Sequence, residues 1–258
     1  MAARSLAADS PARPCQLADA RAAEDAFLRR ATRVIARQGI WRFLAVGNCY
    51  EVVHETLAGF SSGYRIACVS EQRHSAVDGT IVSVTGNPAD ASVITHSDRV
   101  NNLLRDGDRP VAIIMTGVLD RIALLSNARQ YAWQLADWAP EGSFIAATHA
   151  LSETTAPVKS AAITDDAALV FRTARQISGL FSGMAMLPPG LVEVSRWRLN
   201  GGARRDPPAL LRAGGVARKG RQRSGMRPAA TVKNPAIRDP RPTLLPILME
   251  ASGDDLST

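Results

Sequence analysis

Polar residues that could do chemistry stand where apolar runs of the sequence end. His149 closes a run over 143–148, and an imidazole at that position could act as a general base or bind a substrate. The same histidine could instead be hydrogen-bonded within the rim of a sheet. Cys49 follows an earlier run over 41–46, but it lacks a basic neighbour that would favour the reactive thiolate. The sequence therefore offers one candidate base, His149, and no nucleophile–base pair.

Two further polar residues have a structural explanation beside the chemical one. His54 falls inside a predicted helix over 52–58, where we expect its ring to pack rather than to catalyse. Asp120 could bind a substrate amine or cap a helix, and we expect the cap. The three cysteines form no C-x-x-C pair and have no zinc-ligand spacing, so we expect no metal site and a reducing compartment.

Apolar runs and helical periodicity define the elements that must position these residues. The predicted strands cover 41–46, 64–69, 80–84, 111–115 and 143–148, with a final alternating strand over 191–199. The predicted helices cover 18–38, 52–58, 91–104, 127–137 and 165–178. Strands that are apolar throughout and alternate with helices predict an α/β fold, with a parallel sheet covered on both faces. Ligands of such sheets bind beyond the carboxyl ends of the strands, and the first such end is Val46-Gly47-Asn48-Cys49.

The net charge of +7 is concentrated at the end of the chain. Residues 201–258 carry 11 basic and 5 acidic side chains, whereas residues 1–200 carry 20 and 19. The last stretch also contains Pro207-Pro208, Gly214-Gly215 and five further prolines, which interrupt helices and strands. We therefore expect a flexible N-terminus over 1–17, one domain over 18–200 and a disordered Pro/Arg-rich tail over 201–258.

Charge and hydropathy limit the partners that the chain can have. The cluster Arg218-Lys219-Gly220-Arg221-Gln222-Arg223 could contact phosphates in a salt-dependent way. No aromatic residue is interleaved with it, however, and single-strand binders usually stack bases on aromatic rings, so we expect a solvated extension and no nucleic-acid partner. The sequence has no apolar stretch of about 18 residues for a membrane span, and we expect no signal peptide. We expect a cytoplasmic protein without a membrane partner.

Six groups of residues share their order and spacing with one known family. They are Phe27-Leu28-Arg29-Arg30-Ala31 with Gly39-Ile40, Phe43-Leu44 and Gly47; Val53-His54-Glu55; Arg109-Pro110-Val111-Ala112 with Val118-Leu119; Pro140 with Gly142-Ser143-Phe144 and Thr148-His149-Ala150; Pro189-Gly190-Leu191-Val192 with Val194; and Arg196-Trp197-Arg198. Together they resemble an S-adenosylmethionine-dependent methyltransferase family typical of high-GC bacteria, long catalogued as a domain of unknown function. The resemblance covers about residues 24–200. It implies a Rossmann-like class I methyltransferase fold, with a seven-stranded sheet whose last strand is antiparallel.

The resemblance also implies that S-adenosylmethionine binds across the ends of the first strands. The cofactor needs a turn without a Cβ, which Gly47 supplies, so that the backbone can approach its methionine part. A carboxylate after the second strand would accept both ribose hydroxyls, which Glu71 could do from one residue beyond the usual position. Asn87 stands on the adenine side, where its side-chain oxygen could accept from the amine. The candidate cofactor-binding residues are Gly47, Asn48, Ser70, Glu71, Asn87 and Thr116.

Four residues at the expected cofactor site depart from the family's pattern, and one of them is Asn87, which replaces an aspartate. Ala45 replaces an aspartate in the first strand, Cys49 replaces the second glycine of the turn, and Ser70 replaces the ribose carboxylate. Two functions from different classes follow. One is a methyltransferase acting on an oxygen or nitrogen of an unknown small molecule, since methyl transfer depends mainly on alignment and a base is optional. The other is a catalytically inactive member that keeps the fold as a binding or interaction protein. A nicotinamide-dependent enzyme is disfavoured, because no G-x-G-x-x-G follows the first strand.

Overall fold

The structure, a computed structural model, describes residues 14–60, 62–74, 80–152, 159–160, 169–198 and 212–220. Its strands are β1 (Arg42–Gly47), β2 (Arg65–Ser70), β3 (Ile81–Thr85), β4 (Ala112–Thr116), β5 (Phe144–Ala150), β6 (Lys159–Ser160), β7 (Leu169–Val170), β8 (Met184–Met186), β9 (Val192–Glu193) and β10 (Arg212–Lys219). Its helices are α1 (Pro14–Ala36), α2 (Tyr50–Ala58), α3 (Ala91–Thr95), α4 (Asp98–Leu104), α5 (Leu125–Trp138) and α6 (Ala174–Ser178), with the short 3-10 helices η1 (Gly179–Phe181) and η2 (Val194–Arg196). No helix in these ranges has the length and apolarity that crossing a bilayer requires.

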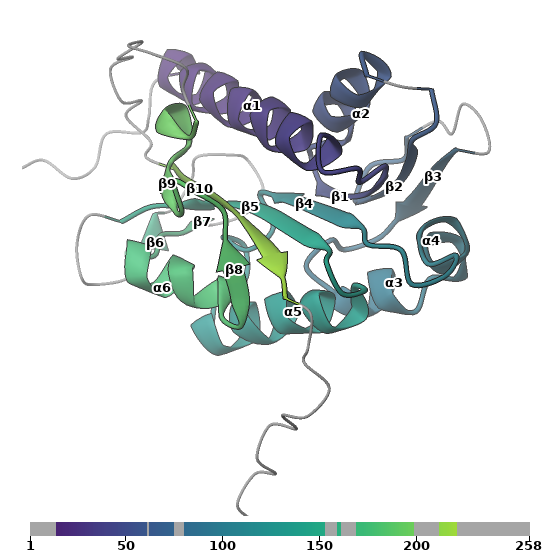
Figure 1. Ribbon diagram of the computed structural model, residues 1–258. Helices are drawn as coiled ribbons and strands as arrows, with labels where there is room; N and C mark the ends of the chain where they lie inside the picture. Colours follow the sequence, from purple (N-terminus) through teal and green to yellow (C-terminus); the bar gives the residue numbers. More distant parts are fainter. Residues whose placement is uncertain are drawn as a thin grey trace, which may run out of the picture. The chain divides into compact units, whose positions relative to one another are not determined.

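Within these ranges, seven strands form one continuous sheet in the order β3-β2-β1-β4-β5-β10-β8, and β9 pairs with β10 as an eighth (Figure 1). The first five strands of that order are parallel, whereas β10 runs antiparallel to β5, β8 and β9. β8 and β9 pair with successive parts of β10, along the edge that faces away from β5. The predicted Rossmann-like sheet with an antiparallel last strand is therefore confirmed.

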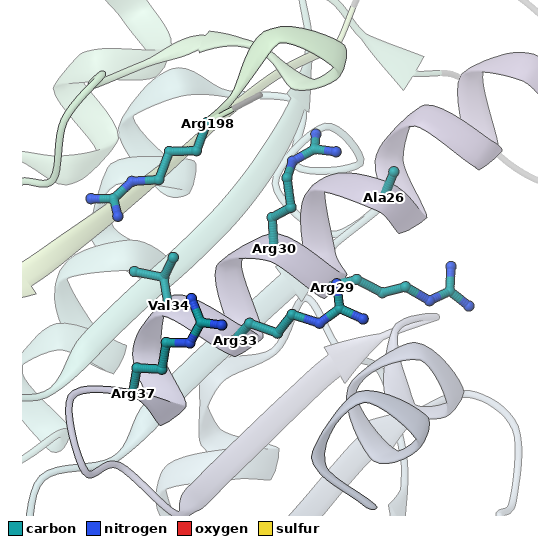
Figure 2. A pocket seen from close by; sticks show the side chains of 7 residues that line it. All are labelled: Ala26, Arg29, Arg30, Arg33, Val34, Arg37 and Arg198. Carbon is teal, nitrogen blue, oxygen red and sulfur yellow. The ribbon is translucent and has the colours of Figure 1, made fainter. Parts of the chain in front are cut away.

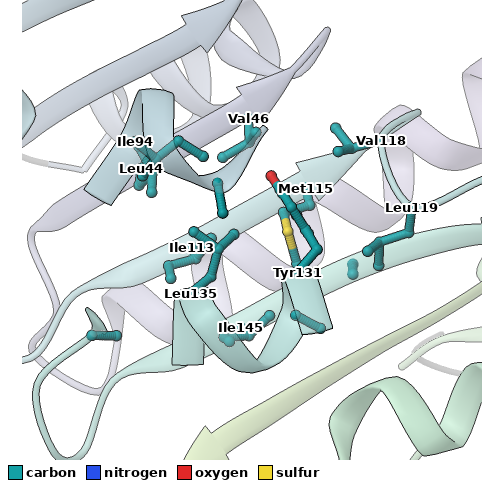
Figure 3. Packing of buried hydrophobic residues seen from close by; sticks show 14 of the residues in the cluster. Leu44, Val46, Ile94, Ile113, Met115, Val118, Leu119, Tyr131, Leu135 and Ile145 are labelled. Carbon is teal, nitrogen blue, oxygen red and sulfur yellow. The ribbon is translucent and has the colours of Figure 1, made fainter. Parts of the chain in front are cut away.

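Two hydrophobic cores lie on opposite faces of the sheet, because successive side chains of a strand point to opposite faces. In β1, Phe43 and Ala45 join the core beneath α1 and α2, whereas Leu44 and Val46 join the core beneath α3, α4 and α5 (Figure 1). Figure 3 shows the second core, where Tyr131 of α5 packs with residues of the central strands. Both faces of the sheet are covered by helices, as the continuous apolar runs predict.

The helix α1 lies on the first face and has two chemically different sides. Phe27, Leu28, Ala31 and Ile35 are fully buried, since their spacing places them on one side of a helix. The chain leaves the helix through Gly39, whose φ of +82° is a left-handed conformation that glycine adopts without a steric penalty. From there it turns back into β1, so the last turn of α1 lies near the amino end of that strand.

The strand β10 corrects the prediction that residues 201–258 form a disordered tail. Gly214 and Gly215, which suggested an irregular chain, are closely packed on the two faces of this strand. A Cβ on Gly214 would lie 3.0 Å from ring atoms of Phe27, and one on Gly215 would lie 2.6 Å from Met186 Cε. The glycine pair thus lets β10 fit among its neighbours. The rest of the predicted tail lies outside the described residues, as does the predicted flexible N-terminus apart from 14–17, which begin α1.

Three further elements differ from the prediction. The predicted helix over 91–104 is two helices, because the hydroxyl of Ser97 caps the start of α4 and restarts the chain there. The predicted strand over 191–199 is reduced to β9, which η2 follows directly. The predicted helix over 165–178 is wrong in its described first part, which contains β7, and α6 begins only after its N-cap residue Thr173. In each case a local capping side chain or a pairing partner outweighs hydrophobic periodicity.

The parallel strands bring the candidate residues to one edge of the sheet. Gly47 of β1 is in register with Thr116 of β4, and Ser70 of β2 is in register with Thr85 of β3. The residues that follow these strands therefore share the carboxyl edge, where ligands of parallel sheets bind.

Candidate functional site

The turn after β1 depends on a glycine. Gly47 has a φ of +84°, and a Cβ at this position would lie 2.3 Å from the backbone oxygen of Thr116 and 3.0 Å from Val118 Cγ2. No other residue fits, because the chain passes directly against the end of β4. Asn48, the next residue, is exposed at the edge. The turn therefore presents the Asn48 side chain to solvent from a fixed backbone.

Cys49 is a packing residue of this turn rather than a nucleophile. It is fully buried, and its Sγ donates to the backbone oxygens of Ile114 at 3.4 Å and Val46 at 3.6 Å. Burial raises the pKa of the thiol well above its ordinary value, so the nucleophilic thiolate is disfavoured. Where the family has a small glycine, this chain has a side chain directed back into the sheet.

At the end of β2, the hydroxyl of Ser70 is hydrogen-bonded within the loop that follows the strand. Ser70 is buried, and its Oγ donates to the backbone oxygen of Gln72 at 2.6 Å. The ring of His74 lies against the same Oγ at 3.1 Å and against the Glu51 carboxylate at 3.2 Å. The ring centres of Tyr50 and His74 lie 4.9 Å apart, and the two ring planes are tilted by 46°. The position expected to contact ribose is thus a locally satisfied serine.

Two other candidates of this half of the edge are exposed. The carboxylate of Glu71 is 62% exposed and has an ion pair with Arg121, which follows β4, at 3.5 Å. Asn87, after β3, is exposed, and its Oδ1 accepts from the backbone N–H of Ala89 at 2.9 Å. The amide N–H groups of Asn87 and most of the Glu71 carboxylate surface therefore face solvent. Both side chains are available to a ligand.

The ends of β4 and β5 are covered by a carboxylate from α1. Thr116 donates its hydroxyl hydrogen to Glu24 Oε1 at 2.6 Å, and Thr148 of β5 donates to the same oxygen. Arg212 Nε of β10 lies 3.0 Å from that oxygen. Glu24 therefore joins α1 to three strands, and Thr116 acts as part of this contact. The site prediction did not include Glu24 or Arg212.

Asp120 is not a helix cap, contrary to expectation. It is fully buried after β4, and its Oδ2 accepts from Arg212 Nη2 at 2.7 Å. Burial opposes the charge of Arg212, but the neighbouring Asp120 and Glu24 carboxylates outweigh burial and raise the pKa of Arg212 above its ordinary value. Arg212 thus bridges two acids inside the molecule. α5 begins instead after Leu124, which supplies no side-chain cap.

His149 has both ring nitrogens engaged. Arg172 Nη1 lies 2.6 Å from Nε2, and Nδ1 lies 2.8 Å from the backbone oxygen of Ala150. Because a guanidinium can only donate, Nε2 accepts and Nδ1 carries the hydrogen of a neutral ring. Burial lowers the pKa of His149 to about 4. Of the two alternatives for His149, this geometry fits a histidine that is hydrogen-bonded within the rim of the sheet. Both ring nitrogens are engaged, so neither is free to act as a base in this arrangement.

Arg172 completes this buried polar network. Arg172 contacts His149 and also donates to the backbone oxygens of Leu119 at 2.8 Å and Ile122 at 2.5 Å. These hydrogen bonds stabilise the turn after β4. We call Glu24, Thr116, Asp120, Thr148, His149, Arg172 and Arg212 the rim network. His54 lies apart from it on α2, with its ring 5.5 Å from Tyr50 and 5.9 Å from Tyr64, as packing predicts.

Comparison with known proteins decides the family. The model of the S-adenosyl methyltransferase family matches residues 2–220. The chain belongs to this family. It is an S-adenosylmethionine-dependent methyltransferase, and the matched region includes β10. A search of curated proteins found no match.

Solved structures of other methyltransferases share the fold. A Thermobifida fusca protein assigned as a methyltransferase superposes with a TM-score of 0.65 at 20% identity, over 78% of this chain and 82% of that one. A DUF574 family protein from Streptomyces avermitilis superposes with a TM-score of 0.61 at 20% identity, over 77% and 83%. The 1,6-didemethyltoxoflavin-N1-methyltransferase of Burkholderia thailandensis, solved with 1,6-didemethyltoxoflavin and S-adenosylhomocysteine, gives 0.51 at 12% identity, over 85% and 98%. At these identities the likeness concerns the fold.

Proposed function

We propose that this methyltransferase transfers the methyl group of S-adenosylmethionine to a small-molecule acceptor, with the cofactor held at the carboxyl edge of β1, β2 and β3. One observation carries the assignment. Asn48, Glu71 and Asn87 follow neighbouring strands and are exposed, whereas the polar groups at the ends of β4 and β5 are engaged with each other. Only the first group can exchange its present contacts for a ligand.

The donor and acceptor groups of this half fit the cofactor. The Glu71 carboxylate has free lone pairs for two ribose hydroxyls, and the Asn87 amide can bond to the edge of adenine. Ser70 is a poor donor, because its hydroxyl hydrogen is already donated to Gln72. Thr116 is likewise committed to Glu24. We therefore assign the polar contacts to Asn48, Glu71 and Asn87, with Gly47 keeping the turn in place.

The chain's own contribution to the reaction is alignment. S-adenosylmethionine supplies a methyl group on a positively charged sulfur, which an oxygen or nitrogen of the acceptor can take directly. Fixing the acceptor near that methyl can provide most of the rate enhancement, and a base is optional. His149 has no free nitrogen, so a base from the rim network is not part of this proposal. The rim network instead holds α1 and β10 beside the edge.

Calorimetric titration of S-adenosylmethionine and S-adenosylhomocysteine into the full-length chain tests the proposal. Glu71→Gln should weaken binding about tenfold or more, because it removes a charged acceptor of two hydroxyl groups. Glu55→Gln is the matched control, since Glu55 is 64% exposed and also pairs with one arginine, Arg29. Equal loss in both variants would contradict the assignment of Glu71. A folded chain that binds neither compound at millimolar concentration would favour the inactive binding protein instead.

We also propose a cytoplasmic location. Cys49 and Cys68 are both buried free thiols in the described part of the chain, and burial raises the pKa of Cys68 to about 12. Unpaired cysteines are the usual state in a reducing compartment. Fractionation of cells producing the tagged chain would test this, and recovery in a membrane or secreted fraction would contradict it.

A further inference from the structure

A groove lined by arginines runs along the outer side of α1, away from the polar residues of the cofactor edge. Arg29, Arg30 and Arg33 of α1, Arg37 in the turn directly after it and Arg198 beyond η2 surround a volume of about 510 Å³ (Figure 2). The two other lining residues, Ala26 and Val34, are small or apolar, so no acidic residue of the described ranges lines the groove. The lining is therefore strongly positive.

Most of this charge lacks an acidic partner within the described ranges. Arg29 pairs with Glu55 at 3.1 Å, and both side chains of that pair are largely solvated. No described ion pair involves Arg33, Arg37 or Arg198. Like charges four residues apart on a helix destabilise it, and the row 29, 33, 37 repeats that spacing twice. A bound anion would relieve this repulsion.

Neutral contacts hold parts of the groove in place. Arg198 Nε donates to the backbone oxygen of Pro188 at 2.8 Å, and the guanidinium lies 5.2 Å from the ring centre of Trp197. Arg30 Nη2 donates to the backbone oxygen of Val194 at 2.7 Å. These contacts orient two guanidinium groups of the groove. Such preorganisation reduces the entropy lost when a ligand binds.

The spacing along α1 calls for a ligand with several anionic groups. Residues four apart on a helix are separated by about 6 Å along its axis, so Arg29, Arg33 and Arg37 span about 12 Å. A ligand with several anionic groups can contact the whole row, whereas a single small anion would require three long side chains to converge on it. Phosphate groups suit it chemically, because planar guanidinium groups bind phosphate oxygens in pairs.

The lining also distinguishes a small phosphorylated ligand from a macromolecule. The volume lies in the range of small-molecule sites. Among the residues that the structure describes, no aromatic side chain lines the groove, so a nucleic-acid strand would find no ring there on which to stack its bases. The large hydrophobic residues that are exposed in the described chain, Phe60, Leu124 and Trp133, lie outside the groove and offer no anchor for a membrane there.

We propose that this arginine groove binds a small ligand bearing two or more phosphate groups, at a site separate from the methyl-transfer edge. Arg33 and Arg37 stand near the end of α1 that leads into the amino end of β1, whereas Glu24 of the same helix contacts the carboxyl ends of β4 and β5. The proposal does not depend on the cofactor assignment.

Titration of inorganic tripolyphosphate into the full-length chain tests the proposal. Tripolyphosphate should bind about tenfold or more tightly than orthophosphate, and Arg33→Gln/Arg37→Gln should weaken tripolyphosphate binding by a similar factor. The matched control, Arg99→Gln/Arg175→Gln, removes the same charge from exposed positions on α4 and α6. It also accounts for binding to basic residues elsewhere in the chain.

Several outcomes would overturn the proposal. One is equal weakening in the two double variants, which would indicate a nonspecific charge effect. Another is equal affinity for tripolyphosphate and orthophosphate. A third is binding of a single-stranded oligonucleotide or of anionic vesicles that depends on Arg33 and Arg37 while tripolyphosphate does not bind. Thermal melts and S-adenosylmethionine titration of each variant separate a failed groove from a misfolded chain and from a failed cofactor site.

Discussion

The two halves of the carboxyl edge use polar residues in opposite ways. At the ends of β1, β2 and β3, Asn48, Glu71 and Asn87 are exposed, and Glu71 has an ion pair on the surface. At the ends of β4 and β5, the rim network is buried except for the partly buried Glu24, and its two acids form ion pairs with Arg212. Exposed ion pairs contribute little to stability, whereas breaking a buried pair is strongly destabilising. The comparison suggests that the first half serves the ligand and the second half serves the fold.

Removing β10 is the most drastic way to break the second half. A chain ending at residue 211 would lose Arg212 and the only strand in the described sheet that joins β8 to β5. We expect this chain to lack a cooperative thermal transition, because two buried ion pairs and the strand pairings of β10 would be lost from a domain whose typical stability is only about 5–15 kcal/mol. A chain ending at residue 221 is the control and should melt like the full-length protein. Equal melting of the two truncated chains would show that β10 is dispensable.

A single substitution tests the buried charges. Arg212→Met should lower the free energy of unfolding by about 3–5 kcal/mol, because Glu24 and Asp120 would remain buried without their cation. Urea denaturation monitored by circular dichroism measures the change. Arg218→Met is the control on the same strand, since Arg218 is exposed and lies over the ring of Phe144.

A substitution at the exposed ends of β1, β2 and β3 gives the stability change with which Arg212→Met is compared. Glu71→Gln should change the free energy of unfolding by less than about 0.5 kcal/mol, because its ion pair is largely solvated. If Glu71→Gln destabilised the protein as much as Arg212→Met, the proposed division between a ligand half and a fold half would be wrong.

Substitution of His149 should have an effect that depends on pH and is smaller than that of Arg212→Met. Its pKa is about 4 in the folded protein and should be near its ordinary value of 6.5 when unfolded, so the unfolded chain binds more protons between these values. The associated stability is complete above about pH 6.5 and falls by about 1.4 kcal/mol per pH unit toward pH 4. Between about pH 7.5 and about pH 5, His149→Gln should therefore lose about 2 kcal/mol less than the unsubstituted chain. Denaturation midpoints at the two pH values measure this, and parallel losses would contradict it.

The sequence was sufficient to predict the parallel half of the sheet but not its completion. Continuous apolar runs located β1, β2, β3, β4 and β5 to within about one or two residues, because burial on both faces leaves little room for polar residues. β10 was missed because Gly214-Gly215 resembles loop composition. Its glycines are needed for contacts with Phe27 and Met186, which are remote in sequence and become visible only in the folded chain.

The candidate site shows the same division between local and remote information. The positions of Gly47 and Glu71 at the edge follow from the strand ends, which local sequence reveals. The rim network does not follow, because it joins residues from α1, β4, β5 and β10 that no common motif connects. Glu24 left one weak signal, an acid three residues before Phe27 on a helix side that is otherwise buried. The role of Asp120 depends on its ion pair with Arg212, which is remote in the sequence and comes close only in the folded chain.

The late position of β10 has a consequence for the newly made chain on the ribosome. Its neighbour β5 is complete at Ala150, about 60 residues before Arg212 is added. At a synthesis rate of about 5–20 residues per second, roughly 3–12 seconds pass in which β5 has no partner on that side. An unpaired strand edge is a template for pairing with other chains. Each growing molecule therefore passes through a short interval of exposure to aggregation, which ends only when nearly all of the fold has been translated.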